Sequence, residues 1–231
     1  MYQHNPLVRR LLLFGVPLAV AALGLIHPGG ATNPGHDGDT IYEQLRDQAD
    51  LFIAVHLLQL VVFSLLALVV WCLIDGLRGP AATVSRVALL VFAVVYAAFD
   101  SVQGIAVGVM VQKGHDLAEA EQGAVRDLIE GYQDSLITGY FNVLGGLGSL
   151  AWLVALVAAA VALRRAGAGT LAVVCLVLAG VVFGIGHPAP FGPIGMGFLL
   201  IAIWRLEAAR RVRAGGPASD EPIGSAAPTS G

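Results

Sequence analysis

Long apolar stretches recur along the whole chain and are separated by short polar segments. Each is close to the length of about 20 apolar residues that an α-helix needs to cross the hydrocarbon core of a bilayer. Extended alternation of apolar and polar residues does not occur, which favours helices over strands. The pattern predicts an all-α membrane bundle of six transmembrane helices, at residues 9–27, 51–75, 86–111, 135–163, 170–187 and 191–205. The last of these is the shortest and opens with PFGPIGMG, which makes it the weakest of the six.

Composition supports a membrane protein. Of the 231 residues, 57% are hydrophobic and 13% are charged, and the mean hydropathy is +0.78. Soluble domains carry about 25% charged residues. The arginines flank the apolar stretches instead of forming a basic patch, so we expect the lipid bilayer as partner and no nucleic acid. A membrane partner protein or a homo-oligomer is left open.

The basic residues lie almost entirely on one side of the predicted bundle. Ten of the 13 Lys and Arg residues fall there, and the other side has only Arg46, Lys113 and Arg126. The positive-inside rule then places both termini in the cytoplasm. The excess of Arg, Ala, Gly and Val indicates a GC-rich bacterial genome, and hence the bacterial plasma membrane. A cleaved signal peptide is the alternative interpretation of the first stretch, and it would leave five spans with the same orientation.

The segments outside the spans have patterns of their own. Thr40-x-x-Glu43 is a capping box, which predicts a helix that runs into the second span. Apolar residues at helical spacing predict another helix within residues 117–132. Residues 207–231 are rich in Gly, Pro, Ala and Ser, and we expect them to be a disordered cytoplasmic tail.

Several polar residues lie inside the predicted spans, where an ionisable group costs at least about 2.5 kcal/mol. Asp100 shares one helical face with Tyr96 and Gln103, which are four residues before it and three after it. His56 and Gln59 share a face of the second span. A rise of 1.5 Å per residue puts these two faces at overlapping depths. We therefore expect His56 and Asp100 to meet in the outer half of the bundle.

Further polar residues reach the same level. Asn142 lies early in the fourth span, and His27 and His187 each precede a proline at the outer end of a span. Proline lacks the N–H that would continue a helix, so each His-Pro leaves its histidine at the rim. The candidate binding residues are Asp100, His56, Gln59, Gln103, Tyr96 and Asn142, and the candidate metal ligands are His27, His56, His187 and Asp100.

The simplest interpretation of these side chains is that they hold helices together, at about 0.6 kcal/mol per hydrogen bond. Gly104-x-x-x-Gly108 is likewise typical of close helix packing. Three functional interpretations stand beside it. The first is a small-molecule or ion site in a transporter or sensor, and the second is a membrane enzyme that binds a divalent metal or haem. The third is a non-catalytic accessory protein.

Sequence motifs do not decide between these interpretations. H-x-x-x-H, H-E-x-x-H and C-x-x-C-H are absent, as are a phosphate-binding loop and a G-x-S-x-G nucleophile motif. These absences favour a protein that is not an enzyme and has no cofactor, with a divalent metal or haem as the alternative.

Four segments carry a resemblance to other proteins: IHPGG, AVHLLQLVVFSLLAL, LRGPAATVSRVALLVFAVVYAAFDSVQGIAVG and GHPAPFGPIG. Through them the chain resembles a group of uncharacterised six-span membrane proteins, mostly from high-GC Gram-positive bacteria. The resemblance covers most of residues 10–205. It implies six spans and a membrane location, and it implies no activity or catalytic residues.

Overall fold

A computed structural model describes residues 6–33, 40–133 and 143–214. These ranges are helical and contain no β-strand. Two segments, η2 and η3, are π-helical, with a wider turn than an α-helix. The elements are α1 (Pro6–Arg10), η2 (Leu11–Gly15), α2 (Val16–Ile26), α3 (Ile41–Leu45), α4 (Ala49–Leu73), α5 (Pro80–Phe99), η3 (Asp100–Ala106), α6 (Val107–His115), α7 (Glu119–Gln133), α8 (Val143–Arg165), α9 (Thr170–Ile185) and α10 (Phe191–Ala214).

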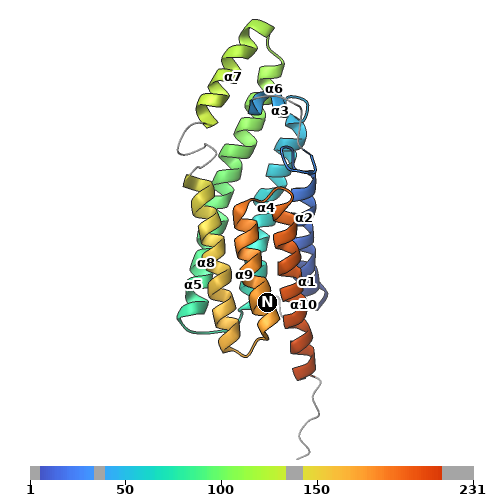
Figure 1. Cartoon of the computed structure of the whole chain (residues 1–231), viewed down its shortest axis with the longest axis vertical. Helices are drawn as coiled ribbons and strands as arrows, with labels where there is room; N and C mark the ends of the chain where they lie inside the picture. Colours follow the sequence, from blue (N-terminus) through green and yellow to red (C-terminus); the bar gives the residue numbers. More distant parts are fainter. Residues whose placement is uncertain (1–5, 34–39, 134–142, 215–231) are drawn as a thin grey trace, which may run out of the picture.

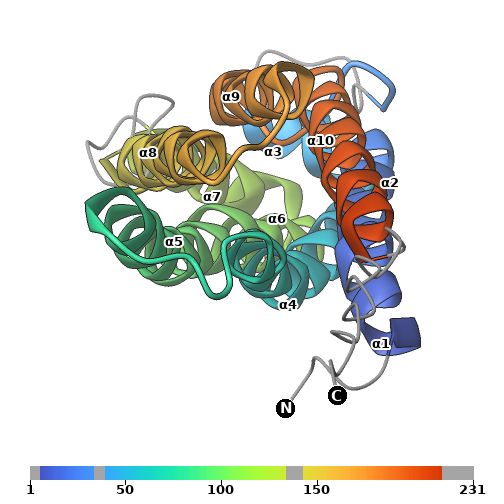
Figure 2. The ribbon, with the colours of Figure 1, turned by 90° about the horizontal axis from the view of Figure 1, so that it is seen from below.

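Six long helices form a closed ring around the core. In chain order, α2, α4, α5, α8, α9 and α10 each pack against the next, and α10 packs back against α2 (Figure 2). The short helices α3 and α7 lie together at one end of the bundle, which we call the α3–α7 end (Figure 1). The end of α10 lies at the opposite end. Short connections between antiparallel helices favour this order of neighbours.

Five helices are long and apolar enough to cross a membrane: Leu7–Ile26, Ala49–Leu73, Pro80–His115, Val143–Arg165 and Phe191–Val212. The remaining apolar helix, Thr170–Ile185, has 16 residues and is shorter than these. At 1.5 Å per residue it is about 24 Å long. The described chain therefore has the fold of a multi-pass membrane protein, with five clear spans instead of the six that the sequence predicts.

Several helix ends differ from the prediction. The final helix, predicted at 191–205, continues to Ala214, so residues 207–214 are helical and not a disordered tail. The third span runs from Pro80 to His115 instead of 86–111, because η3 and α6 continue α5 without a break. The fourth begins at Val143 in the described chain, and the predicted start at 135–142 lies outside the described residues.

The capping box at Thr40 is confirmed, since its side chain accepts a hydrogen bond from the Glu43 backbone N–H. However, α3 does not run into α4. Gln48 has a non-helical φ of −128°, and a turn separates the two helices. The predicted second loop helix is α7, which packs against α3 and α6, and Ile129 is buried in this contact.

Large aromatic side chains fill the middle of the ring. Phe63, Phe92, Trp152 and Phe183 come from four different helices, and all are buried. Their rings form a closed circuit with centroids 6.4, 4.9, 5.5 and 5.7 Å apart in that order. Such spacings are typical of favourable aromatic pairs. This layer closes the bundle beneath the α3–α7 end.

Charged groups meet at the opposite end of the bundle. Arg9 donates two hydrogen bonds to the Glu207 carboxylate, which also accepts one from Arg210 at 2.8 Å. Arg210 donates further to the Leu73 carbonyl at the end of α4, at 3.0 Å. This group, which we call the Glu207 cluster, ties α1, α4 and α10 together. It also explains why α10 stays helical past residue 205.

Candidate functional site

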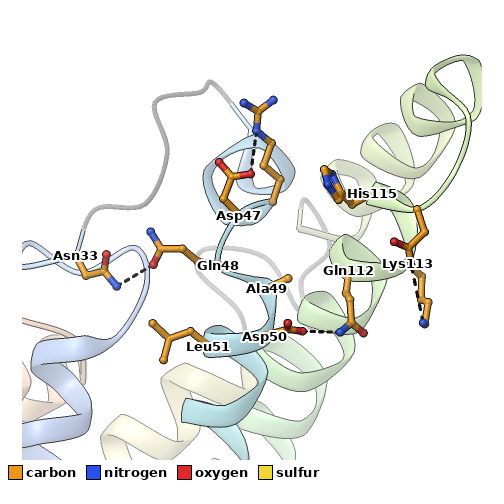
Figure 3. Close-up of a pocket in the computed structure, with 11 residues that line it drawn as sticks. Asn33, Asp47, Gln48, Ala49, Asp50, Leu51, Gln112, Lys113 and His115 are labelled. Atoms are coloured by element: carbon orange, nitrogen blue, oxygen red, sulfur yellow. Dashed lines mark hydrogen bonds and ion pairs between the residues drawn. The ribbon is translucent and has the colours of Figure 1, made fainter.

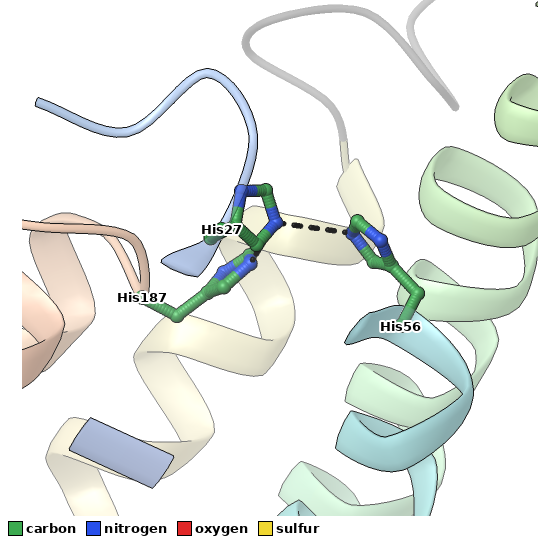
Figure 4. Close-up of side chains that lie close together, drawn as sticks. All are labelled: His27, His56 and His187. Atoms are coloured by element: carbon green, nitrogen blue, oxygen red, sulfur yellow. Dashed lines mark hydrogen bonds between the residues drawn. The ribbon is translucent and has the colours of Figure 1, made fainter. Parts of the chain in front are cut away.

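Three histidines from three separate segments meet at the α3–α7 end. His27 follows the last residue of α2, His56 lies in the second turn of α4, and His187 lies in the connection before α10 (Figure 4). All three are buried, with 6%, 3% and 8% of their surface exposed. We call them the histidine cluster. In the described part of the chain, they are the one group of three or more His, Cys, Asp or Glu residues that is arranged to hold a metal ion.

The ring nitrogens converge on one point. Nε2 of His27 lies 3.4 Å from Nε2 of His56 and 3.3 Å from Nε2 of His187. The three residues each offer one ligand nitrogen, and these nitrogens all lie within 4.8 Å of one another. The rings meet edge to face, so the nitrogens, and not the ring faces, point to the shared centre.

Each histidine also has a partner on its outer nitrogen. Nδ1 of His27 lies 2.7 Å from the Pro28 carbonyl, and Nδ1 of His56 lies 2.8 Å from the Phe52 carbonyl. Nδ1 of His187 lies 3.1 Å from the Tyr96 hydroxyl. Histidines that ligate a metal nearly always have such an outer hydrogen bond, which fixes the ring and its tautomer.

These hydrogen bonds determine where the protons are in two of the rings. A carbonyl only accepts, so Nδ1 of His27 and of His56 carries the hydrogen, and each neutral ring has a bare lone pair on Nε2. The two lone pairs face each other across 3.4 Å and cannot form a hydrogen bond. A positive charge between them removes the conflict. A buried imidazolium is expensive without a carboxylate partner, whereas a metal ion is the charge that these lone pairs bind.

The spacing fits a single tetrahedral ion. With zinc–nitrogen bonds of about 2.0–2.1 Å, two ligands of a tetrahedral zinc lie about 3.3–3.4 Å apart. Two of the three separations in the cluster have this value. The pair of His56 and His187 has a larger ring separation, with centroids 6.2 Å apart, so binding requires these two side chains to approach each other.

The same spacing does not fit haem. Axial ligands hold a haem iron from opposite faces of a flat macrocycle. The ring centroids of His27 lie only 4.9 Å from those of His56 and 5.0 Å from those of His187. Rings this close leave no room for a macrocycle between them. Of the two cofactor alternatives that the sequence leaves open, the geometry favours the divalent metal.

Backbone contacts fix the segments that carry His27 and His187. The Ala189 N–H donates to the Gly24 carbonyl at 2.9 Å, and the Ala31 N–H donates to the Ala189 carbonyl at 3.0 Å. A Cβ on Gly24 would lie 2.7 Å from the His187 carbonyl oxygen, so only glycine allows this approach. The two His-Pro segments, far apart in sequence, are therefore joined directly.

A second set of contacts ties the His27 segment to α4. Asn33 donates to the Ile26 carbonyl at 3.1 Å and to the Gln48 side chain at 2.8 Å. Thr32 donates to the Leu25 carbonyl. These side chains satisfy carbonyls that the end of α2 leaves without an intrahelical partner. They also place His27 beside the first turns of α4, where His56 lies.

His56 depends on a glycine of η3. A Cβ built on Gly104 would lie 2.0 Å from Cδ2 of His56, so the imidazole ring occupies the space that any other residue would fill. The sequence motif Gly104-x-x-x-Gly108 predicts close packing, and the structure shows that this packing seats the His56 ring. Neither glycine chemistry nor spacing could have indicated that a histidine was the neighbour.

Asp100 and Gln59 lie directly below the cluster on the same two helices. Asp100 has no exposed surface, and neither carboxylate oxygen has a hydrogen-bond partner among the described residues. Oε1 of Gln59, 1% exposed and one turn after His56, has none either. The packing of α4 against α5 and η3 confirms that the second and third spans are neighbours. The predicted meeting of His56 with Asp100, however, is not a direct hydrogen bond in the described structure.

The other predicted site residues lie in different places. Tyr96 belongs to the site through its hydroxyl on His187. Gln103 does not, because it donates to Gln133 of α7. The cause is η3: its wider turn places Gly104, and not Gln103, over Asp100 and beside His56. Asn142 lies outside the described residues.

A polar cavity of about 720 Å³ lies further toward solvent at the α3–α7 end (Figure 3). Its lining includes Asn33 and Gln48, the pair that ties the His27 segment to α4, and Asp50, which accepts a hydrogen bond from Gln112. The cavity therefore borders the outer side of the segment that carries His27.

Comparison with known proteins adds no name to this arrangement: no family model, no curated protein and no solved structure matches the chain.

Proposed function

We propose that this protein binds one divalent transition-metal ion, of the zinc type, through Nε2 of His27, His56 and His187. The observation that supports this most strongly is the pair of 3.4 and 3.3 Å contacts between nitrogens of the histidine cluster. Nitrogens that carry lone pairs repel at this distance, and a tetrahedral metal ion requires the same distance. The neutral imidazole is also the commonest protein ligand for such ions.

A resident ion fits the structure better than an ion in transit. The aromatic layer of Phe63, Phe92, Trp152 and Phe183 closes the bundle below Asp100 and Gln59. Among the described residues below that layer, the buried polar side chains are Ser85, which bonds to the Ala155 carbonyl, and Glu207. Polar groups for a path through the bundle are therefore missing from the described part of the chain.

The experiment uses the full chain, purified in detergent and stripped with a chelator, and then exposed to zinc. We expect one bound ion per chain, and a stabilisation of about 2.7 kcal/mol when free zinc is about 100 times the dissociation constant. His56→Ala should abolish both effects. The matched control is His115→Ala, because His115 is exposed at the end of α6 and outside the cluster. Equal zinc binding by wild type and His56→Ala would refute the proposal.

We also propose the location that the sequence indicates: a bacterial plasma membrane, six spans with α9 as the sixth, and both termini in the cytoplasm. The apolar helices support a membrane protein, and the distribution of arginines supports the orientation. The histidine cluster would then face the cell exterior. A reporter that is active only in the cytoplasm, fused after residue 231, tests this: activity supports the orientation, and inactivity with full expression contradicts it.

A further inference from the structure

The acid below the histidine cluster lacks the partner that its burial demands. Asp100 is fully buried, and both of its carboxylate oxygens lack a hydrogen bond among the described residues. Leaving a buried polar group without a partner costs about 1–3 kcal/mol, and more for a charged one. The other buried acid in the described chain, Glu207, accepts three hydrogen bonds from two arginines. A missing donor close to Asp100 would account for the difference.

The position of Asp100 shows where that donor lies. One turn before it, Tyr96 bonds to His187, and one turn after it, Gly104 contacts the ring of His56. Asp100 is therefore on the helix face that touches two members of the histidine cluster. It is not among the three side chains whose ligand atoms lie within 4.8 Å of one another, so it lies beyond direct coordination in this arrangement.

Resting on the proposed function, we infer that the metal has a fourth coordination position that faces Asp100, and that this position takes an exchangeable water or small oxygen-donor ligand. Three histidines leave one tetrahedral position open, and zinc sites with three protein ligands and a water are catalytic, while structural sites have four protein ligands. A metal-bound water donates two hydrogen bonds, which matches the unsatisfied oxygens of Asp100 and of Gln59.

Charge supports the same arrangement. A divalent ion bound by three neutral imidazoles brings two positive charges into a protein interior, where an uncompensated charge is expensive. Asp100 supplies one negative charge beside the site, and an anionic fourth ligand supplies another. In the described chain, no other buried acid is near the cluster, because Glu207 lies at the opposite end of the bundle.

The test uses Co²⁺ as the metal, because its visible absorption bands report the ligands, and azide as the probe of the open position. We expect azide to change the bands of the wild-type protein. In Asp100→Asn, Co²⁺ stays bound, and azide should saturate at a concentration at least about tenfold lower, because the substitution removes a negative charge close to the anion. The matched control is Asp50→Asn, the same charge change at an exposed residue in the polar cavity, which should leave azide binding unchanged.

The possible failures are distinct. If wild type does not take up Co²⁺, the metal proposal itself fails. If Co²⁺ binds but azide changes the bands of neither wild type nor Asp100→Asn, the site is closed and this inference is wrong. If a folded Asp100→Asn loses Co²⁺, Asp100 is a direct ligand, which also contradicts it. Asp100→Ser, neutral and smaller, replaces Asp100→Asn if that variant does not fold.

Discussion

The two ends of the bundle each bury a group of polar side chains, but they treat them in opposite ways. In the Glu207 cluster every charge is paired: Glu207 accepts from Arg9 and Arg210, and Arg210 also bonds to the end of α4. In the histidine cluster, bare nitrogens face one another and Asp100 below them lacks a partner among the described residues. Polar groups that serve the fold are expected to be satisfied within it. Groups left unsatisfied indicate a ligand.

The largest effect on stability is expected at the Glu207 cluster. Glu207→Gln leaves Arg9 and Arg210 beside a neutral amide, and loss of one partner from a buried ion pair costs about 3–5 kcal/mol. Because Arg9 is partly exposed, we expect the lower end, about 3 kcal/mol, in urea unfolding monitored in detergent. Zinc affinity should not change. A variant with wild-type stability would show that the ion pairs contribute little, and the contrast between the two ends would lose half its basis.

The next effect is expected on metal affinity. Gly104→Ala places a methyl group where the His56 ring lies, so the ring must leave its position. We expect zinc affinity to fall about 100-fold, the upper part of the range for changes that disturb ligand orientation. Isothermal titration with zinc measures it. Gly197→Ala is the control, because a Cβ at this position of α10 meets nothing within 4 Å. Equal affinities in the two variants would contradict the role of Gly104.

The smallest effect is expected on the stability of the metal-free protein. Asp100→Asn keeps the shape of the side chain and removes a charge that has no partner, so burying it becomes cheaper. We expect unfolding free energy to stay unchanged or to rise by about 1 kcal/mol, the opposite sign to Glu207→Gln. Thermal unfolding of the two variants in chelator compares them. A loss of several kcal/mol would mean that Asp100 is satisfied within the fold after all.

The sequence predicted the helical membrane fold because long apolar runs with arginines at their ends admit few other structures. Helix ends were less predictable. Residues 207–214 are polar in sequence, and they stay helical because Glu207 and Arg210 have partners on α1 and α4. The short α9 shows that an apolar run and a helix of spanning length are different things.

The candidate site was predicted in part. Polarity in an apolar context singled out His56 and Asp100, and the repeated His-Pro singled out His27 and His187. The sequence could not show that α2, α4 and the segment before α10 converge, because that depends on the closed ring of helices. Nor could it show the π-helical turn at Asp100, which moves Gln103 away and presents Gly104 to His56.

The most direct test of the account is X-ray absorption spectroscopy of the zinc-loaded protein, which reports the atoms bound to the metal and their distances. We expect three imidazole nitrogens and one oxygen at about 2.0–2.1 Å. Six oxygen ligands, sulfur ligands, or fewer than three imidazoles would contradict a metal site formed by His27, His56 and His187.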